Sequence, residues 1–140
     1  MRPFEYLEHT ADCGVLARGR SLNELFEHAA LGMFGLVADF EPRDAAQAVP
    51  VVLGPNDIEG LLVDWLNELL YLFETTDSIF TEFTVFSVSA DAGLRGEAAA
   101  EKINPARHRL KHEIKAVTYH RLEVRGNARD GWTARVFFDV

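Results

Sequence analysis

The chain has 140 residues, of which 48% are apolar and 26% are charged, a balance typical of one compact domain. Its net charge of −8 at pH 7 argues against a protein that holds free RNA or DNA through the phosphates, because such binding needs Lys and Arg. Cys13 is the only cysteine, which excludes a disulfide framework and a cysteine-based zinc site. The N-terminal residues lack the apolar core of a signal peptide, and no apolar run approaches the about 20 residues of a membrane span. We therefore expect a single cytosolic domain over residues 1–140.

The first half of the chain predicts a helix between strands. Residues 4–8 alternate as a half-buried strand does, and residues 15–17 continue this pattern. Ser21 and Glu24 form a capping box, and apolar residues at helical spacing follow as far as Val37. An acidic, alanine-rich loop then leads to a short strand over residues 49–53.

The strongest helical pattern begins after Pro55. Asn56 is the expected N-cap, and one wide apolar face extends from Ile58 to Phe73. The acidic residues of the first turn suit the positive end of the helix dipole. We expect this helix to end near residues 75–77.

The second half of the chain changes to the two-residue period of strands. Residues 80–88 and 94–102 predict a hairpin, residues 104–108 a loop, and residues 114–124 and 132–140 the last two strands. This order places two helices against a mostly antiparallel sheet. The predicted fold class is therefore α+β.

No catalytic template is complete in the sequence. A serine nucleophile elbow, a phosphate-binding glycine loop and a zinc-protease helix are all absent. Cys13 follows His9 by four residues, but a lone cysteine is more often a small buried side chain than a nucleophile. His108 and His112 are expected to be surface histidines, because Pro105 and the β-pattern after it disfavour a metal-binding helix.

Three acidic groups could form a metal site. The C-terminal strand is apolar up to its last residue, so the Asp139 side chain and the α-carboxylate of Val140 should be held close together. If Asp12 lay beside them, a hard cation such as Ca²⁺, Mg²⁺ or Mn²⁺ would be needed to offset their repulsion. Asp12 could equally be a simple turn residue next to Gly14.

A second candidate lies in the strand-like run over residues 115–120. Alternation predicts Lys115, Val117 and Tyr119 on one face of the strand, with Thr118 and His120 on the other. The pattern alone is also that of an ordinary strand with one polar face.

Four segments together resemble the archease family. They are the His-Thr-Ala-Asp run at residues 9–12, the Leu-Val-Asp-Trp-Leu-Asn-Glu-Leu-Leu helix at 62–70, Glu-Ile-Lys-Ala-Val-Thr-Tyr-His at 113–120, and the closing Phe-Phe-Asp-Val. They occur in the family's order and span nearly the whole chain. Cys13 departs from the family pattern, which usually has an aliphatic residue after the Asp.

The resemblance implies an accessory protein for the RNA ligase that joins 3′-phosphate and 5′-hydroxyl ends in tRNA splicing and RNA repair. Family members are not ligases. They help the Mn²⁺- and GTP-dependent ligase to acquire its guanylate and to turn over repeatedly. The implied fold is α+β, built on strand-helix-strand-strand units. Whether RNA itself is contacted stays open.

The resemblance also implies roles for individual residues. The family's divalent-metal site corresponds to Asp12, Asp139 and the terminal carboxylate of Val140, and its functionally important lysine corresponds to Lys115. His120 and His9 are further candidates for contact with phosphate or with the partner. Residues 102–140 carry 9 basic and 4 acidic residues, so most of these groups lie in the one positive segment of the chain.

Two other classes of function compete with this prediction. One is a chaperone or specificity modulator of another RNA-modifying enzyme, such as a tRNA methyltransferase, in which the metal is purely structural. The other is a metal-dependent phosphohydrolase, which the sequence disfavours because it offers neither an evident nucleophile nor a second metal cluster.

Overall fold

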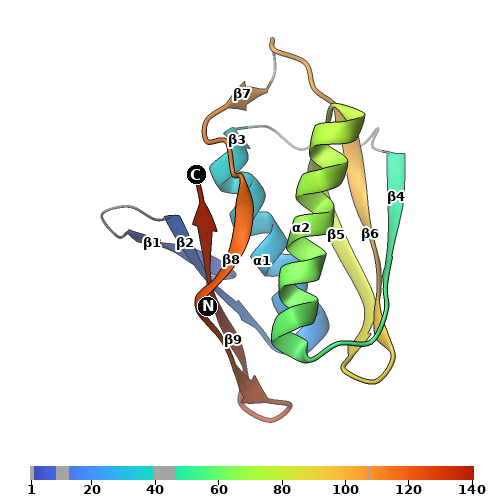
Figure 1. The fold of residues 1–140 in the computed structure, drawn as a ribbon, viewed down its shortest axis with the longest axis vertical. Coiled ribbons are helices and arrows are strands. Elements are labelled where there is room, and N and C mark those ends of the chain that lie inside the picture. Colours follow the sequence, from blue (N-terminus) through green and yellow to red (C-terminus); the bar gives the residue numbers. More distant parts are fainter. Residues whose placement is uncertain (1, 9–12, 40–46, 107) are drawn as a thin grey trace.

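The structure is a computed structural model, and it describes residues 2–8, 13–39, 47–106 and 108–140. Its two helices and nine strands confirm the α+β class (Figure 1). In chain order they are β1 Phe4–Glu8, β2 Cys13–Gly19, α1 Leu22–Val37, β3 Ala38–Asp39, β4 Gln47–Leu53, α2 Ile58–Thr76, β5 Ser78–Ser89, β6 Gly93–Lys102, β7 Arg109–Leu110, β8 Ala116–Asn127 and β9 Gly131–Asp139.

The strands form two larger sheets and one small pair, where the sequence predicted one sheet. The first sheet has the order β1-β2-β9-β8, the second has the order β4-β6-β5, and β3 pairs with β7. Every pairing among the described strands is antiparallel. In Figure 1 the two helices run side by side between the two larger sheets, and α1 contacts both β2 and β5.

The predicted capping box at the start of α1 is present. The backbone N–H of Glu24 donates to the Ser21 hydroxyl at 3.1 Å. The Glu24 carboxylate accepts in return from the backbone N–H of Arg20, one residue before the cap. The first interaction satisfies an N–H group that a helix start leaves without a partner, and the second holds the chain that enters the helix.

The cap of α2 differs from the prediction. Asp57, and not Asn56, is the N-cap, because its carboxylate accepts from the backbone N–H of Gly60 at 2.6 Å. The Asn56 side chain instead accepts from the N–H of Asp57 and donates to Asp64. The helix ends, as expected, at Thr76, and the C-cap Asp77 has a φ of 51° in the left-handed region.

The core lies between the helices and the inner faces of the sheets. Trp65 of α2 is fully buried, and its indole N–H donates to the carbonyl of Phe26 on α1 at 3.0 Å. Phe34 stacks on Phe83 with 5.5 Å between ring centroids and meets Phe80 edge-on at 5.6 Å. Neither helix is long and apolar enough to cross a membrane, as far as the described residues extend.

One histidine expected on the surface is buried. His108 is only 4% exposed, its Nδ1 accepts from the backbone N–H of Asn104, and its Nε2 lies 3.7 Å from a Glu101 carboxylate oxygen. The prediction of a surface residue was therefore wrong for His108, because Asn104 and Glu101 lie against its ring. His112 is exposed, as expected.

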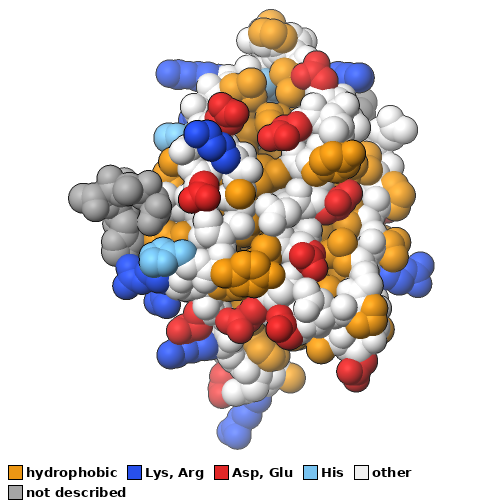
Figure 2. Space-filling model, in the orientation of Figure 1, with side chains coloured by type: hydrophobic (Ala, Val, Ile, Leu, Met, Phe, Trp, Pro, Cys, Tyr) orange, Lys and Arg blue, Asp and Glu red, His pale blue; other side chains and the backbone are white. Residues whose placement is uncertain are grey.

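Acidic side chains are scattered over the face of the molecule that Figure 2 shows, with small apolar areas between them.

Candidate functional site

The last strand, β9, lies between β2 and β8 and holds the chain end in the sheet. Cys13 of β2 pairs with Phe138, and Ala116 of β8 pairs with Asp139. The backbone N–H of Lys115 donates to the carbonyl of Asp139 at 2.8 Å. The structure thus confirms that the chain end is held in the sheet, and it places Lys115 directly beside Asp139.

Two of the three predicted metal ligands lie together at this end of β9. Asp139 is exposed, and Val140, which follows the strand, is 45% exposed. Asp12, the third predicted ligand, and His9 lie outside the described residues. Among the residues that the structure describes, no three His, Cys, Asp or Glu side chains come together to hold a metal ion.

The donors that are present fit a hard cation. The Asp139 side chain and the terminal carboxylate offer oxygen ligands only, at a solvent-accessible strand end, which suits Ca²⁺, Mg²⁺ or Mn²⁺ better than softer metals. In the sequence, Asp12 directly precedes Cys13. Cys13 pairs with Phe138, the residue directly before Asp139.

His120 reaches the same region through a break in β8. The register with β9 shifts between Thr118 and Glu123, and Arg121 has a φ of 55° in the left-handed region. The Thr118 hydroxyl donates to the carbonyl of Phe137 and accepts from the N–H of His120. This hydroxyl therefore links the two strands where the backbone ladder is interrupted.

The residues between Thr118 and Glu123 form a bulge in β8, and this bulge covers Phe137, which lies on the face of β9 that points away from the core. Phe137 is only 2% exposed, its ring centroid lies 6.2 Å from that of His120, and the Arg121 guanidinium carbon lies 5.9 Å from it. Phe137 and Asp139 are two residues apart on one strand, so their side chains share a face. The structure thus places His120 on the face of Asp139, next to Phe137.

The expected alternation of residues 115–119 is only partly present. Val117 is buried, whereas Tyr119 is 63% exposed and does not share its environment. The prediction fails at Tyr119 because the bulge begins there. A helix also holds Val117 in place, because the backbone N–H of Val117 donates to the side-chain oxygen of Asn67 on α2 at 3.1 Å.

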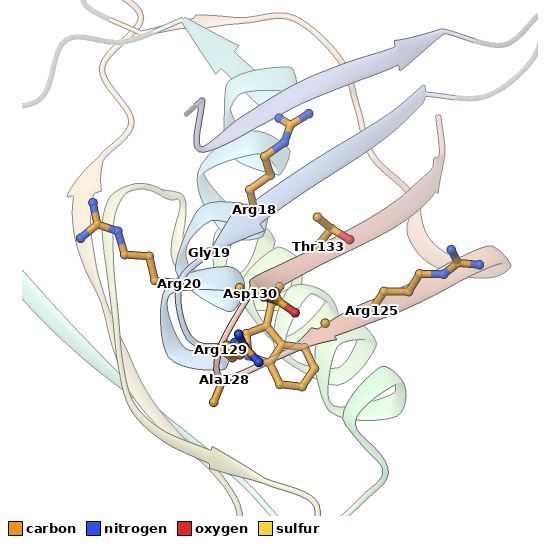
Figure 3. A pocket seen from close by; sticks show the side chains of 11 residues that line it. Arg18, Gly19, Arg20, Arg125, Ala128, Arg129, Asp130 and Thr133 are labelled. Carbon is orange, nitrogen blue, oxygen red and sulfur yellow. The ribbon is translucent and has the colours of Figure 1, made fainter.

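A pocket of about 400 Å³ at the opposite end of β9 was not predicted from the sequence. Arginines from β2, the segment after it, β8 and the β8–β9 turn surround this pocket, and Figure 3 shows their side chains. They are Arg18, Arg20, Arg125 and Arg129. The available signal was two pairs of closely spaced arginines, each next to a glycine at a predicted strand end.

Comparison with known proteins identifies the family. The model of the archease protein family matches residues 4–140. A protein named archease from Methanosarcina acetivorans is 44% identical over 142 residues, which cover 99% of this chain and 97% of that protein. The solution structure of protein 1598 from Methanobacterium thermoautotrophicum has a TM-score of 0.84, 38% identity and full coverage of both chains. The crystal structure of an archease from Thermotoga maritima, at 23% identity and a TM-score of 0.57, covers 100% of this chain and 98% of that chain and shares the fold. The chain belongs to the archease family.

Proposed function

We propose that this chain is a non-catalytic activator, in the cytosol, of the Mn²⁺- and GTP-dependent RNA ligase that joins 3′-phosphate to 5′-hydroxyl ends. It promotes guanylylation of the ligase and thereby repeated turnover. Membership of the archease family supports the proposal. The observation that carries it is the convergence of Lys115, Asp139 and the terminal carboxylate at one exposed strand end.

Asp12, Asp139 and the carboxylate of Val140 would hold a divalent cation there. Such a cation supplies positive charge that phosphate oxygens can share during guanylate transfer. The protein's part is to present the carboxylates on a strand fixed on both sides, by β2 and by β8. A rigid, exposed tip of this kind could enter the mouth of a partner's active site.

Lys115, whose backbone contacts Asp139, and His120, whose ring lies by Phe137, would contact the ligase or a phosphate group. The backbone of Lys115 is fixed by Asp139, while its side chain is exposed and available to a partner. His120 is exposed and held against Phe137, which directs it to the face of Asp139. His9 is proposed in the same role from its neighbourhood to Asp12 in the sequence.

Single-turnover guanylylation of the ligase, with and without this protein, tests the proposal. Asp12→Ala, or one residue added after Val140, should abolish the stimulation while the circular dichroism spectrum and the unfolding midpoint stay unchanged. Asp91→Ala, which removes an exposed acid from the β5–β6 turn, is the matched control and should stimulate fully. Full stimulation of guanylylation by both altered proteins would contradict the proposal.

A further variant, Asp139→Ala, addresses the competing role as a chaperone of another RNA-modifying enzyme with a structural metal. In that role, Asp139→Ala would lower the thermal unfolding midpoint, and ligase guanylylation would not respond to the protein at all. Turnover of nucleotides or of RNA 3′-phosphates by the protein alone would instead indicate an enzyme.

A further inference from the structure

The arginine pocket concentrates positive charge in an acidic protein. Its lining contains Arg18, Arg20, Arg125 and Arg129 and one acid, Asp130, although the chain carries a net charge of −8. In Figure 3 the Arg129 side chain lies beside Asp130, while the side chains of Arg18, Arg20 and Arg125 extend outward in different directions. Such a local excess of positive charge attracts an anion whatever the sign of the whole protein.

Two of the four guanidinium groups already have acidic partners. Arg18 is 2.7 Å from Glu5, and Arg125 is 2.7 Å from Glu123. Within the described residues, the guanidinium groups of Arg20 and Arg129 make no ion pair. Arg20 and Arg129 are thus available to a ligand, while the two paired arginines are held in place beside them.

The turn that carries Arg129 is ordered by one side chain. The Asn127 side-chain oxygen accepts from the backbone N–H groups of Arg129, at 2.9 Å, and Asp130, at 2.8 Å. The Asn127 amide also donates to the Asp130 carboxylate at 3.2 Å. Asp130 is therefore partly satisfied within its own turn, which reduces its competition for the arginines.

An aromatic ring lines the same pocket. Trp132 is partly buried and packs against the edge of the core, and on β9 it pairs with Gly19 of β2 and with Gly126 of β8. Neither neighbour has a side chain to cover the indole across the strands. At Gly126 the φ of 137° requires glycine, and a Cβ there would meet the carbonyl oxygen of Gly131 at 2.2 Å.

From this combination we infer that the pocket binds a nucleotide, with its phosphate held by the exposed side chains of Arg20 and Arg129 and its base against Trp132. Guanidinium groups form paired, charge-assisted hydrogen bonds to phosphate oxygens, and an indole offers a stacking surface to any base. A volume of about 400 Å³ lies within the range of pockets for small ligands. The nucleotide can be free or part of a single RNA strand, since both present the same phosphate and base.

This pocket is separate from the proposed metal-bearing tip. Trp132 and Asp139 lie at opposite ends of β9, about 24 Å apart at the rise of a strand. Nucleotide binding here therefore needs neither the cation nor the ligase, and it can be tested on the protein alone.

Calorimetric titrations with GMP, with a single-stranded RNA decamer and with inorganic phosphate test the inference in buffer that contains a chelator. Arg20→Ala combined with Arg129→Ala should weaken nucleotide binding about tenfold or more, because both unpaired phosphate contacts are lost. Arg95→Ala, an exposed arginine of β6, is the matched control and should change the affinity less than twofold.

A second pair of variants tests the stacking. Trp132→Leu should weaken binding of the nucleotide about tenfold and leave phosphate binding unchanged, and Trp132→Phe should restore much of the loss. In the unaltered protein, nucleotide should quench the fluorescence of Trp132, since Trp65 is fully buried.

Each outcome decides a point. Binding of GMP alone identifies a free nucleotide as the source, and binding of only the decamer, weakening as salt rises, identifies an RNA strand. The inference is overturned if neither ligand binds, if Arg95→Ala costs as much as the double variant, or if phosphate binds as tightly as GMP and Trp132→Leu has no effect.

Discussion

The side-chain oxygen of Asn67 on α2 accepts a hydrogen bond from the backbone N–H of Val117, a residue of the edge strand β8. Because Val117 is only 6% exposed, water cannot replace this partner. Asn67→Ala should therefore lower the free energy of unfolding by about 1–3 kcal/mol, the cost of an unsatisfied buried donor. Urea unfolding measures this, and hydrogen exchange of the Val117 amide should accelerate.

Glu68→Ala provides the control for this prediction, since Glu68 is the next residue of α2 and leaves the Val117 contact intact. Its effect should stay within about 0.5 kcal/mol. Equal effects of the two substitutions would mean that the helix, and not the Asn67 contact, determines the result.

Gly14 leaves room for the ring of Phe137, against which the bulge of β8 packs. A Cβ at position 14 would lie 2.7 Å from Cε1 of Phe137 and 3.3 Å from the Cβ of Leu7. The ring has no space to retreat, because it is only 2% exposed beneath His120. Gly14→Ala should destabilise the fold by about 1–3 kcal/mol, as overpacking does. It should also shift the amide resonances of His120 and Asp139 in a heteronuclear NMR spectrum.

Gly54→Ala is the matched control for the overpacking. A Cβ there would meet no described atom within 4 Å, and the φ of Gly54 lies outside the left-handed region. This substitution should be neutral or stabilise by up to about 1 kcal/mol, through the entropy of the unfolded chain. Destabilisation by Gly54→Ala similar to that by Gly14→Ala would contradict the role of Phe137.

Burial of the Tyr6 phenol, and to a lesser extent the nearby negative charge of Asp39, raises the pKa of Tyr6 above its ordinary value of 10. The folded state therefore favours the protonated phenol, which donates to the carbonyl of Gly32 at 3.1 Å. The stability that this gives is fully present below pH 10 and is lost as the pH rises through the folded pKa.

A difference absorbance titration between the native protein and Tyr6→Phe should reveal one phenol that ionises above pH 10. Tyr71→Phe, which alters an exposed tyrosine of α2, is the control for the stability measurements. The stability advantage of the native protein over Tyr6→Phe should shrink in urea unfolding above pH 10. A difference curve with its midpoint at or below 10 would contradict the shift.

The helices and long hairpins could be predicted from the sequence because their signals are local. Ser21 with Glu24, and the apolar face from Ile58 to Phe73, each lie within one element. The cap of α2 was assigned one residue early because Asn56 and Asp57 are both good caps, and only the contact with Gly60 distinguishes them. The division into two sheets depends on which distant strands pair, which no local pattern encodes.

The candidate site was only partly predictable for the same reason. The apolar chain end indicated that Asp139 is held in the sheet, and its contact with Lys115 agrees. The bulge that turns His120 over Phe137 depends on the left-handed φ of Arg121. Arginine rarely adopts this conformation, so the sequence did not indicate a bulge at this position. The arginine pocket joins residues 18–20 to residues 125–133, so the net charge of the whole chain could not reveal it.

The free edge of β5 is covered by side chains of α1. The backbone N–H of Val85 donates to the Glu27 carboxylate at 2.8 Å, and the carbonyl of Phe86 accepts from the Asn23 amide at 3.2 Å. β5 is an edge strand of its sheet, and unpaired edge groups invite pairing with a second chain. Glu27→Ala should therefore destabilise by about 1–3 kcal/mol, since Val85 is only 4% exposed, and should promote association at high concentration.

Glu27→Gln and Asn23→Ala separate the hydrogen bond from the charge and from the general packing of α1. The amide oxygen of Gln can still accept from Val85, so Glu27→Gln should retain most of the stability. Asn23→Ala should cost less than Glu27→Ala, because Phe86 is 60% exposed and water can reach its carbonyl. Urea unfolding ranks the three variants, and light scattering over a concentration series measures association. If Glu27→Ala is no less stable than Asn23→Ala and stays monomeric, the Glu27 contact does not protect the strand edge.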